Sequence, residues 1–394
     1  MKRSIRIGAL MATLAFVLAA CGSSGGSSAK KPDNQGSKGG ASGGSVAILA
    51  WPGYAENGST SKDVDWVTPF ETESGCKTSV KTFGTSDEAF QLFNTGQYDV
   101  VSASGDSSLR SVANGDAAVI DTAKVTTYGN LAGFLKEKAW NSVDGKVYGV
   151  PHGWGANLLM YNETVVTPAP DSWGVVFEAT SPYKGKVTAY DSPIYIADAA
   201  LYLSKTKPEL KITNPYALDD EQFAAAVDLL KEQKPNIGEY WSDYLKEQEA
   251  FTKGSLVLGT TWQVITNLIQ ADTASPAVNA IVPKEGSTAW SDSWMISTKS
   301  KNVDCAYKWI NWITSPKVQA QEAEYFGEAP ANPQACTFTS DKNFCTTFHA
   351  EDQAYYQQLA FWTTPTAKCA DGRTDVTCKA YKDWTAAWDE IKGS

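Results

Sequence analysis

Aromatic and acidic side chains recur directly after the expected strands of this chain, or in the loops that leave them. The seven residues of this kind are Trp51, Tyr54, Asp106, Asp191, Trp262, Trp290 and Asp292. Carboxylates accept the hydrogen bonds of an ammonium group directly, and indole faces attract a cation while they cover methylene groups. We therefore expect a cleft lined for a small organic cation, with Ser104 in the loop at its mouth.

These residues also have purely structural interpretations. Trp51 and Trp262 could fill the core at the ends of strands. Asp191 could cap a helix that begins near Ile194, and Asp106 could be a turn residue in a Ser-Gly-Asp-Ser run. The recurrence of the same two residue types in two α/β units favours the binding interpretation.

The composition argues against several other classes of function. The chain of 394 residues has a formal net charge of −10, which disfavours nucleic acid and anionic membrane surfaces as partners. Its histidines are His152 and His349, so sites built from several histidines are excluded, and no G-x-S-x-G, P-loop or H-E-x-x-H motif occurs. We expect a binding protein without cofactor or metal; the enzymatic alternative is a hydrolase with Asp191 and Asp292 as its acid pair.

The amino terminus has the pattern of a bacterial lipoprotein signal. A basic start precedes an apolar run over residues 7–20, which is too short to span a membrane. The run ends in Leu-Ala-Ala-Cys, which is similar to a lipobox, and residues 22–44 are mostly small and polar. We expect a signal peptide over 1–20, then a lipidated Cys21 and tether over 21–45. This pattern predicts a protein anchored to the extracytoplasmic face of the cell membrane.

The other six cysteines are an even number, as expected for disulfides in an oxidising compartment. Six cysteines allow fifteen pairings. The simplest scheme joins the cysteines that are nine residues apart and leaves one long-range bridge. The bridges are then Cys76–Cys305, Cys336–Cys345 and Cys369–Cys378.

Strands that alternate with helices are expected to position the candidate residues. In the first unit we expect strands at 45–51, 77–82 and 98–101, with helices at 65–72 and 86–94. In the second we expect strands at 145–151, 156–161, 186–190, 256–260 and 278–283, with helices at 194–203, 220–233 and 305–314. Residues 102–108 and 153–155 are expected to be loops or turns. This order indicates an α/β fold, whose ligands bind at the carboxyl ends of strands.

Several longer segments resemble a known family. They are ILAWPGY at 48–54, YDVV at 98–101, SASGD at 102–106, YDSPIYIADAAL at 190–201, PKEG at 283–286, WSD at 290–292 and CAYKW at 305–309. Over about residues 46–365 the chain thereby resembles solute-binding proteins of bacterial ABC importers, in the spermidine/putrescine-binding group, and within it the YdcS-type branch. The resemblance implies two lobes, each a mainly parallel sheet flanked by helices, with a ligand cleft between them.

The resemblance also implies roles for the candidate residues. These are a first aromatic pair (Trp51, Tyr54), a carboxylate for one amine (Asp191), a ring beside the methylene chain (Trp262) and a grip on a second amine (Trp290, Asp292). Three positions depart from the group: Ile194 replaces a second acid, and Asp106 and Glu328 replace tyrosines. We expect a small cationic amine as cargo, with Glu328 as a further site residue; a quaternary amine or a sugar is the alternative.

The resemblance finally implies domain boundaries and partners. We expect lobe 1 over 46–155 plus about 290–330, and lobe 2 over 156–289 plus about 331–394. The protein is expected to be a monomer that closes over its ligand and delivers it to the permease subunits of an ABC importer.

Overall fold

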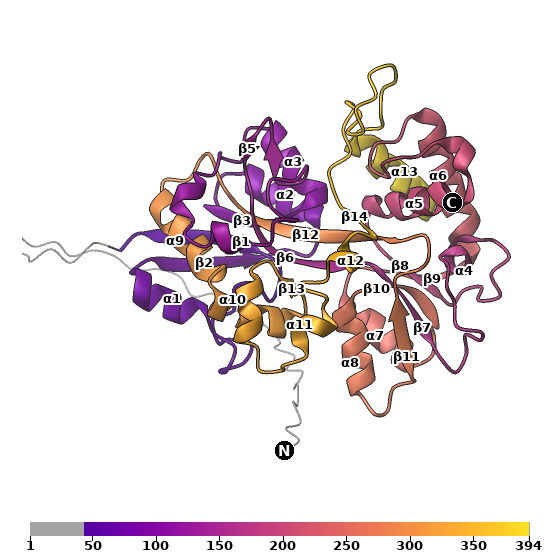
Figure 1. Ribbon diagram of the computed structural model, residues 1–394, viewed down its shortest axis with the longest axis horizontal. Helices are drawn as coiled ribbons and strands as arrows, with labels where there is room; N and C mark the ends of the chain where they lie inside the picture. The colour runs from indigo at the N-terminus through magenta and orange to yellow at the C-terminus, as the bar shows by residue number, and fades with distance from the viewer. Residues whose placement is uncertain (1–42, 394) are drawn as a thin grey trace, which may run out of the picture. The chain divides into compact units, whose positions relative to one another are not determined.

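The computed structural model describes residues 43–393 of the chain (Figure 1). The expected signal peptide, Cys21 and nearly all of the tether lie outside these residues, so their roles stay predictions. Among residues 43–393, no helix is both long enough and apolar enough to cross a membrane.

The first sheet collects strands from distant parts of the chain. Its order is β13-β6-β12-β3-β1-β2, and β14 pairs with β12. The strands are β1 (Ser45–Ala50), β2 (Lys77–Thr82), β3 (Val100–Ser104), β6 (Val150–Ala156), β12 (Ser287–Ile296), β13 (Ala329–Pro330) and β14 (Leu359–Phe361). β1 pairs in parallel with β2 and β3, as expected. β12 runs antiparallel to β3 and β6, so the sheet is mixed rather than mainly parallel.

The helices around this sheet begin and end where the local sequence favours it. They are α1 (Val67–Ser74), α2 (Ser86–Asn94), α3 (Gly105–Ala113), α9 (Val303–Ile313) and α10 (Pro316–Phe326). Thr85 caps α2 by accepting a hydrogen bond from the backbone of Glu88. α1 ends at Gly75, which has a φ of 71°. This left-handed backbone conformation is strained for most residues but not for glycine, which has no β-carbon. Phe70 of α1 packs edge to face on Trp309 of α9, with ring centroids 5.2 Å apart.

The second sheet has the order β11-β7-β10-β8-β9. Its strands are β7 (Leu158–Asn162), β8 (Val187–Tyr190), β9 (Ile237–Trp241), β10 (Leu258–Thr261) and β11 (Val278–Ile281). The helices of this unit are α4 (Gly174–Phe177), α5 (Ile196–Thr206), α6 (Asp220–Gln233), α7 (Tyr244–Thr252) and α8 (Gln263–Ala271). β8 pairs in parallel with β9 and β10, whereas β7 is antiparallel to β10 and β11. A small hairpin, β4 (Ser142–Val143) and β5 (Lys146–Val147), stands apart from both sheets.

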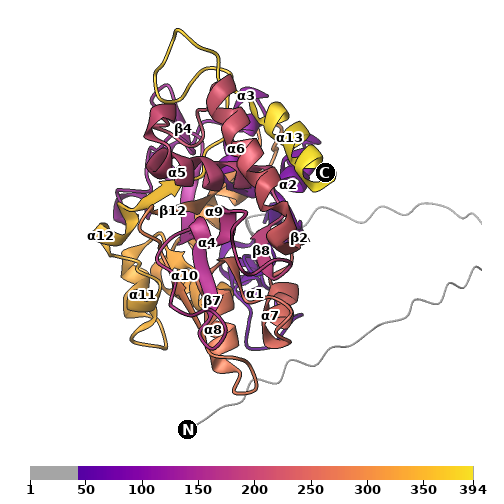
Figure 2. The same cartoon turned by 90° about the vertical axis from the view of Figure 1, so that its right-hand side faces the viewer.

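Three segments of the described chain pass between the two sheets. Asn157 alone separates β6 from β7, residues 282–286 join β11 to β12, and the chain after β14 leads to α13 (Tyr381–Gly393). α13 packs on the second unit through Trp384 and Trp388, and Figures 1 and 2 show it beside α6. Short crossings of this kind allow two halves to move about a hinge.

The chain returns to the second unit later than expected. β14 pairs with β12 in the first sheet, and Tyr356 stacks on Phe134 with ring centroids 4.2 Å apart. α11 (Phe344–Thr347) and α12 (Gln353–Tyr356) precede β14. Residues 331–361 therefore pack with the first sheet, and not with the second lobe, in which residues 331–394 were expected. A three-residue strand such as β14 is too short to be recognised from its sequence.

The three expected disulfides are all formed. Cys76–Cys305 joins the start of the β2 region to α9 across a separation of 229 residues. The other two close local loops with a separation of nine residues, and they are Cys336–Cys345 and Cys369–Cys378.

Two expected loops are regular structure instead. Residues 102–108 complete β3 and begin α3, which puts Asp106 in the first turn of a helix, and residues 153–155 lie within β6. The run at 290–292, expected to follow a strand, lies in the middle of β12. All ten residues of β12 are buried. Three serines, a threonine and an aspartate are among them, so this core strand is half polar and its sequence does not show the apolar run of a typical buried strand.

Candidate ligand-binding site

The side chain of Tyr54 joins two buried carboxyl groups. Its hydroxyl oxygen lies 2.8 Å from Oδ2 of Asp292 and 2.7 Å from Oε2 of Glu328, and none of the three residues is more than 3% exposed. A tyrosine hydroxyl carries one hydrogen and can donate it to only one of two acceptors. In this arrangement one of the two carboxyl groups must therefore be protonated and donate to the tyrosine oxygen. The pair then carries at most one negative charge.

β12, β3 and the end of α10 bring these groups together. Alternate residues of a strand share a face, so Trp290 and Asp292 lie on the same face of β12. Ser104, the last residue of β3, is the register partner of Asp292. α10 ends at Gly327, which has a φ of 88° and so adopts the left-handed conformation. Glu328 is the next residue. Four expected site residues are thus assembled around the Tyr54 hydroxyl or directly beside it.

A bulge in β6 adds a histidine to this cluster. Asp292 pairs with Gly153 and Ser293 pairs with Pro151, so His152 is the extra residue between the two pairs. Bulges of this kind re-aim a side chain, and they are common beside functional sites.

The buried imidazole of His152 contacts Tyr54 and two glutamates, one in α10 and one just after it. Its ring packs edge to face on Tyr54, with centroids 4.3 Å apart. Its Nε2 lies 3.3 Å from Oε2 of Glu322 and 3.7 Å from Oε1 of Glu328. The side chains of His152, Glu322 and Glu328 are completely buried.

Burial controls the protonation of this cluster. Loss of contact with water raises the pKa of Glu322 and of Glu328 well above the usual glutamate value, and it also raises the pKa of Asp292. The same cause lowers the pKa of His152, so its imidazole is neutral near pH 7. The cluster therefore favours protonated carboxyl groups, and a cation that enters it would take the place of protons.

Two expected tryptophans form a wall beside the acids. Trp262 and Trp290 meet edge to face with centroids 6.0 Å apart, and Trp290 also contacts Phe326. A narrow pocket is lined by both indoles and by Glu328, and its volume is about 20 Å³. Such a volume holds about one water molecule. The two units, each a sheet with its helices, must therefore move apart before an organic cation can enter this pocket.

A chain of hydrogen bonds fixes the indole of Trp262. Its Nε1 donates to Oδ1 of Asn157 over 3.0 Å, and Nδ2 of Asn157 donates to Oγ1 of Thr288 over 2.7 Å. Thr288 donates to Oδ1 of Asp198 over 2.8 Å, and the hydroxyl of Tyr190 donates to the other oxygen of that carboxylate. Burial raises the pKa of Asp198 to about 7. The chain links both sheets through the Asn157 crossing.

Sequence reasoning missed several members of these two networks. His152 is one of only two histidines, and this rarity was its only signal. Asp198 interrupts the apolar run at 196–201, which is a usable signal for a buried acid. Glu322 lies among other acids and glutamines of α10, where nothing distinguishes it from a surface residue.

The structure places Asp191 away from this arrangement. Its Oδ1 accepts hydrogen bonds from Nε1 of Trp388 over 2.9 Å and from Nζ of Lys392 over 2.8 Å, both in α13. The helical turn that follows is capped by Ser192, whose side chain accepts from the backbone of Ile194. The alternative interpretation of Asp191 as a helix cap is therefore wrong, and its carboxylate is paired with an ammonium group of the chain itself. Its expected role as a ligand for an amine stays a prediction.

Asp106 lies near enough to the acid cluster to interact with the charge of Asp292, whereas Trp51 packs on a ring of the first sheet's own core. The buried carboxyl of Asp106 lies beside Ser86 and Arg110, and burial raises its pKa to about 7. The ring of Trp51 packs on Phe83 with centroids 4.5 Å apart, as its core interpretation predicts.

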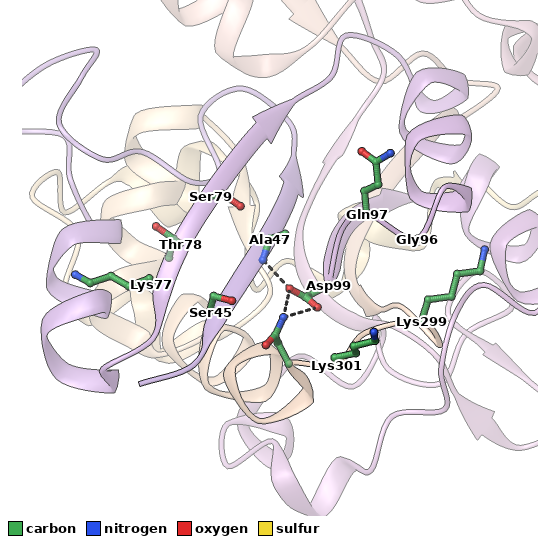
Figure 3. A pocket seen from close by; sticks show the side chains of 11 residues that line it. Ser45, Ala47, Lys77, Thr78, Ser79, Gly96, Gln97, Asp99, Lys299 and Lys301 are labelled. Atoms are coloured by element: carbon green, nitrogen blue, oxygen red, sulfur yellow. Dashed lines mark hydrogen bonds between the residues drawn. The ribbon is translucent and has the colours of Figure 1, made fainter. Parts of the chain in front are cut away.

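A larger pocket lies at the other ends of the parallel strands (Figure 3). Its volume is about 400 Å³, and its lining includes Ser45 and Lys77, which are the first residues of β1 and β2. Asp99 in this pocket accepts hydrogen bonds from the backbone of Ala47 and from Nδ2 of Asn302. Ligands of parallel sheets bind at the carboxyl ends of strands, so we place the site at the acid and tryptophan cluster instead.

Comparisons with known proteins agree with this architecture. A family model described as bacterial extracellular solute-binding protein matches residues 65–346. The spermidine/putrescine-binding periplasmic protein of Escherichia coli (strain K12) is 27% identical over 267 residues, which cover 67% of this chain and 72% of that protein. The putrescine-binding periplasmic protein SpuD of Pseudomonas aeruginosa (strain UCBPP-PA14) is 25% identical over 343 residues, which cover 83% and 88%. The expected YdcS-type branch stays a prediction.

Solved structures share the two-lobed α/β fold. A putative spermidine/putrescine ABC transporter protein from Listeria monocytogenes matches with a TM-score of 0.71 at 19% identity, over 88% of this chain and 98% of that one. The spermidine/putrescine substrate-binding protein PotD from Streptococcus pneumoniae matches with a TM-score of 0.67 at 19% identity, over 89% and 97%. Because the family model spans most of the sequence, this chain belongs to the bacterial extracellular solute-binding proteins.

Proposed function

We propose that the protein is the substrate-binding component of an ABC importer and that it captures a small cationic amine, such as putrescine or spermidine. The observation that carries this proposal is the pair of buried carboxyl groups on the Tyr54 hydroxyl, Asp292 and Glu328, beside the tryptophan wall. The names of the curated relatives support an amine as cargo. The role requires no catalytic step.

The site offers an ammonium group strong acceptors. A cation leaves water at low cost only where hydrogen bonds replace those of the solvent. Oδ1 of Asp292 is buried, and the hydroxyl of Ser104 lies close to this carboxyl group. A carboxylate oxygen accepts more than one hydrogen bond, so Oδ1 can accept from an N–H group. The indoles of Trp262 and Trp290 would cover methylene groups, at about 0.8 kcal/mol for each one buried. A quaternary amine has no N–H to donate and would offer Oδ1 of Asp292 no hydrogen bond, which favours primary amines as cargo.

The pairing of Asp191 with Lys392 bears on the cargo as well. The carboxylate that the family resemblance suggests for one amine is already neutralised by α13. We propose that Asp191 anchors this helix and that the site holds one ammonium end of its ligand closely. Monoamines of similar length should then bind with affinities near those of diamines.

The proposed location rests on the amino terminus. A lipid on Cys21 and a polar tether would hold the binding unit, as a monomer, close to the permease subunits in the membrane. Replacement of this residue in a Cys21→Ser variant should move the protein from the membrane fraction to the soluble extracytoplasmic fraction. A variant that stays in the membrane fraction would contradict lipid anchoring.

Calorimetry of the purified protein tests the cargo. The ligands are putrescine, spermidine, agmatine, betaine and maltose. We expect the primary amines to bind with Kd values on the order of 1 µM, which corresponds to about −8 kcal/mol. Tryptophan fluorescence should fall on binding, because the indoles of Trp154, Trp262 and Trp290 line the pocket. Binding of maltose without a response to any amine would overturn the proposal.

A further inference from the structure

Three side chains that are typical metal ligands meet in the core beside the pocket. One donor atom from each of His152, Glu322 and Glu328 lies within 4.8 Å of the other two, and all three residues have 0% exposure. The set combines one imidazole with two carboxylates, which come from β6 and from α10 and its end.

The donor atoms of this set have no protein donor within residues 43–393 when both glutamates are ionised, and Glu322 lies close enough to Glu328 for the two to share a proton. Both ring nitrogens of His152, both oxygens of Glu322 and Oε1 of Glu328 are buried without a hydrogen-bond partner among the described residues. Nε2 of His152 lies 3.3 Å from Glu322 but does not form a hydrogen bond with it, so the nitrogen is not directed at that oxygen. Buried polar groups are almost always satisfied, and this set can be satisfied by protons or by a cation held among them.

We propose that His152, Glu322 and Glu328 bind one divalent transition-metal ion, for which zinc is the best match. Zinc accepts neutral imidazole and carboxylate ligands at about 2.0–2.2 Å, and three protein ligands with an open fourth position are a common arrangement. Ligands at that distance in a tetrahedron are about 3.4 Å apart. The histidine nitrogen lies 3.3 Å and 3.7 Å from the two carboxylate oxygens. Calcium requires six to eight oxygen ligands, and magnesium prefers oxygen ligands and keeps several waters, whereas this fully buried set includes an imidazole nitrogen.

Neighbouring groups hold the ligands in this orientation. The hydroxyl of Tyr54 lies 2.7 Å from Oε2 of Glu328, while Oε1 of the same carboxylate is the oxygen nearest His152. The carbonyl of His152 accepts hydrogen bonds from Nε2 of Gln319 over 2.7 Å and from the backbone of Ala331 over 3.0 Å. The bonds to its carbonyl fix the backbone of His152, whereas the hydroxyl of Tyr54 contacts a proposed ligand group directly. A hydrogen bond to a ligating carboxylate orients it and commonly changes metal affinity by about 10–100-fold.

The pocket gives the ion a route to the site. Glu328 borders the pocket as well as the cluster, so an ion can reach it when the two units separate. A β-carbon at Gly153 would lie 1.7 Å from Oε1 of Glu328, so β6 passes this carboxylate closely because the position is glycine. Asp292 is not part of the metal set and remains available to an amine.

Zinc titration of the chelator-treated protein tests the proposal. Calorimetry should give one zinc per chain, and cobalt(II) should give the visible absorption of a low-coordinate site. Glu322→Gln and His152→Ala should each weaken zinc binding by about 100-fold or more. His349→Ala tests the other histidine, a partly exposed residue that lies 3.2 Å from Asp352 and lines the same pocket. Because His349 is not one of the three proposed ligands, its loss should leave zinc binding unchanged. Melting temperatures without metal establish that each variant is folded.

Several outcomes would overturn the proposal. One is a folded wild-type protein that takes up neither zinc nor cobalt near neutral pH, which would leave protons to balance the charge of the cluster. Others are uptake that persists in a folded Glu322→Gln variant and uptake that is lost in His349→Ala. Trp262→Ala should weaken amine binding and leave zinc binding intact, so failure of this proposal can be distinguished from failure of the amine proposal.

Discussion

Single residues determine the charge that the site can carry. Tyr54 provides one hydroxyl hydrogen for two carboxyl groups, so Asp292 and Glu328 share a proton in the described arrangement. Burial favours the protonated acids. A cation that enters can displace this proton, and the site then gains a full charge–charge contact without a permanent cluster of buried anions. A binding site of this type can remain stable without its ligand.

The hydroxyl of Tyr54 should matter for both stability and binding. Tyr54→Phe removes the group that satisfies two buried oxygens, so we expect the free energy of unfolding to fall by about 1–3 kcal/mol. Amine affinity should fall as well. Urea unfolding and calorimetry measure the two effects, and Tyr356→Phe, on a ring stacked against Phe134, is the control. Unchanged stability and affinity would show that the bridge has no energetic role.

Asp191 should behave as a structural residue. Asp191→Asn loses a partly exposed ion pair with Lys392, so we expect the free energy of unfolding to change by about 0–1 kcal/mol. The affinity for putrescine should stay close to that of the wild type. Calorimetry checks this expectation, and loss of putrescine binding in a folded variant would restore Asp191 as a ligand.

Two strands do most of the positioning at the scale of elements. β12 carries Trp290 and Asp292 on one face, while β6 contributes His152 through its bulge. Asn157 follows β6 directly and fixes Trp262 by a hydrogen bond. Both strands lead to crossings between the sheets, so the same elements can align the site and transmit the movement of the two units.

Buried acids on these elements should make stability depend on pH. The pKa values of Asp198 and Asp106 are about 7 in the folded protein, against about 3.9 in an unfolded chain. The folded state therefore holds more protons than the unfolded state between these values, and stability falls as the pH rises from about 4 to 7. Asp198→Asn should reduce this slope by up to about 1.4 kcal/mol per pH unit. Urea unfolding at several pH values measures how the free energy of unfolding changes with pH. Equal slopes for the wild type and for Asp198→Asn would contradict this expectation.

The sequence predicted the elements better than the site. The strands at β1 and β2 and the helices α2 and α6 are found where apolar spacing and caps indicated them. The segment at 290–292 was expected to follow a strand but lies within β12. The expectation was wrong because a fully buried strand need not alternate apolar with polar residues. His152 could not be identified, because a bulge depends on the register with a partner strand distant in sequence. Residue type and family resemblance singled out Tyr54, Asp292 and Glu328 as candidates, whereas their contact depends on three-dimensional packing.

At the scale of the whole molecule, closure is the central feature. Trp262 belongs to the second unit and Trp290 to the first sheet, and their contact narrows the pocket to about 20 Å³. Ligand entry then requires opening about the crossings near Asn157, while binding favours closure. A permease can recognise the closed state that results, which is the step this family contributes to import.

The long-range disulfide should stabilise the molecule more than the local bridges. Cys76–Cys305 restricts a loop of 229 residues in the unfolded chain, whereas the other two bridges restrict loops of nine. Replacement of both cysteines by alanine should lower the free energy of unfolding by about 2–5 kcal/mol. Replacement of Cys369 and Cys378 is the matched comparison, measured by urea unfolding under non-reducing conditions. An equal or larger loss from the local bridge would contradict the argument from loop length.

The affinity of Asp292→Asn for putrescine tests the account most directly. The substitution keeps the shape of the side chain and removes the acceptor charge, so we expect putrescine binding to weaken by roughly 10- to 100-fold. Glu247→Gln, at another fully buried acid in α7, controls for the loss of a buried carboxyl group and should keep the wild-type affinity. Both melting temperatures should stay near that of the wild type. An Asp292→Asn protein that is folded and binds putrescine as tightly as the wild type would contradict the proposed amine site.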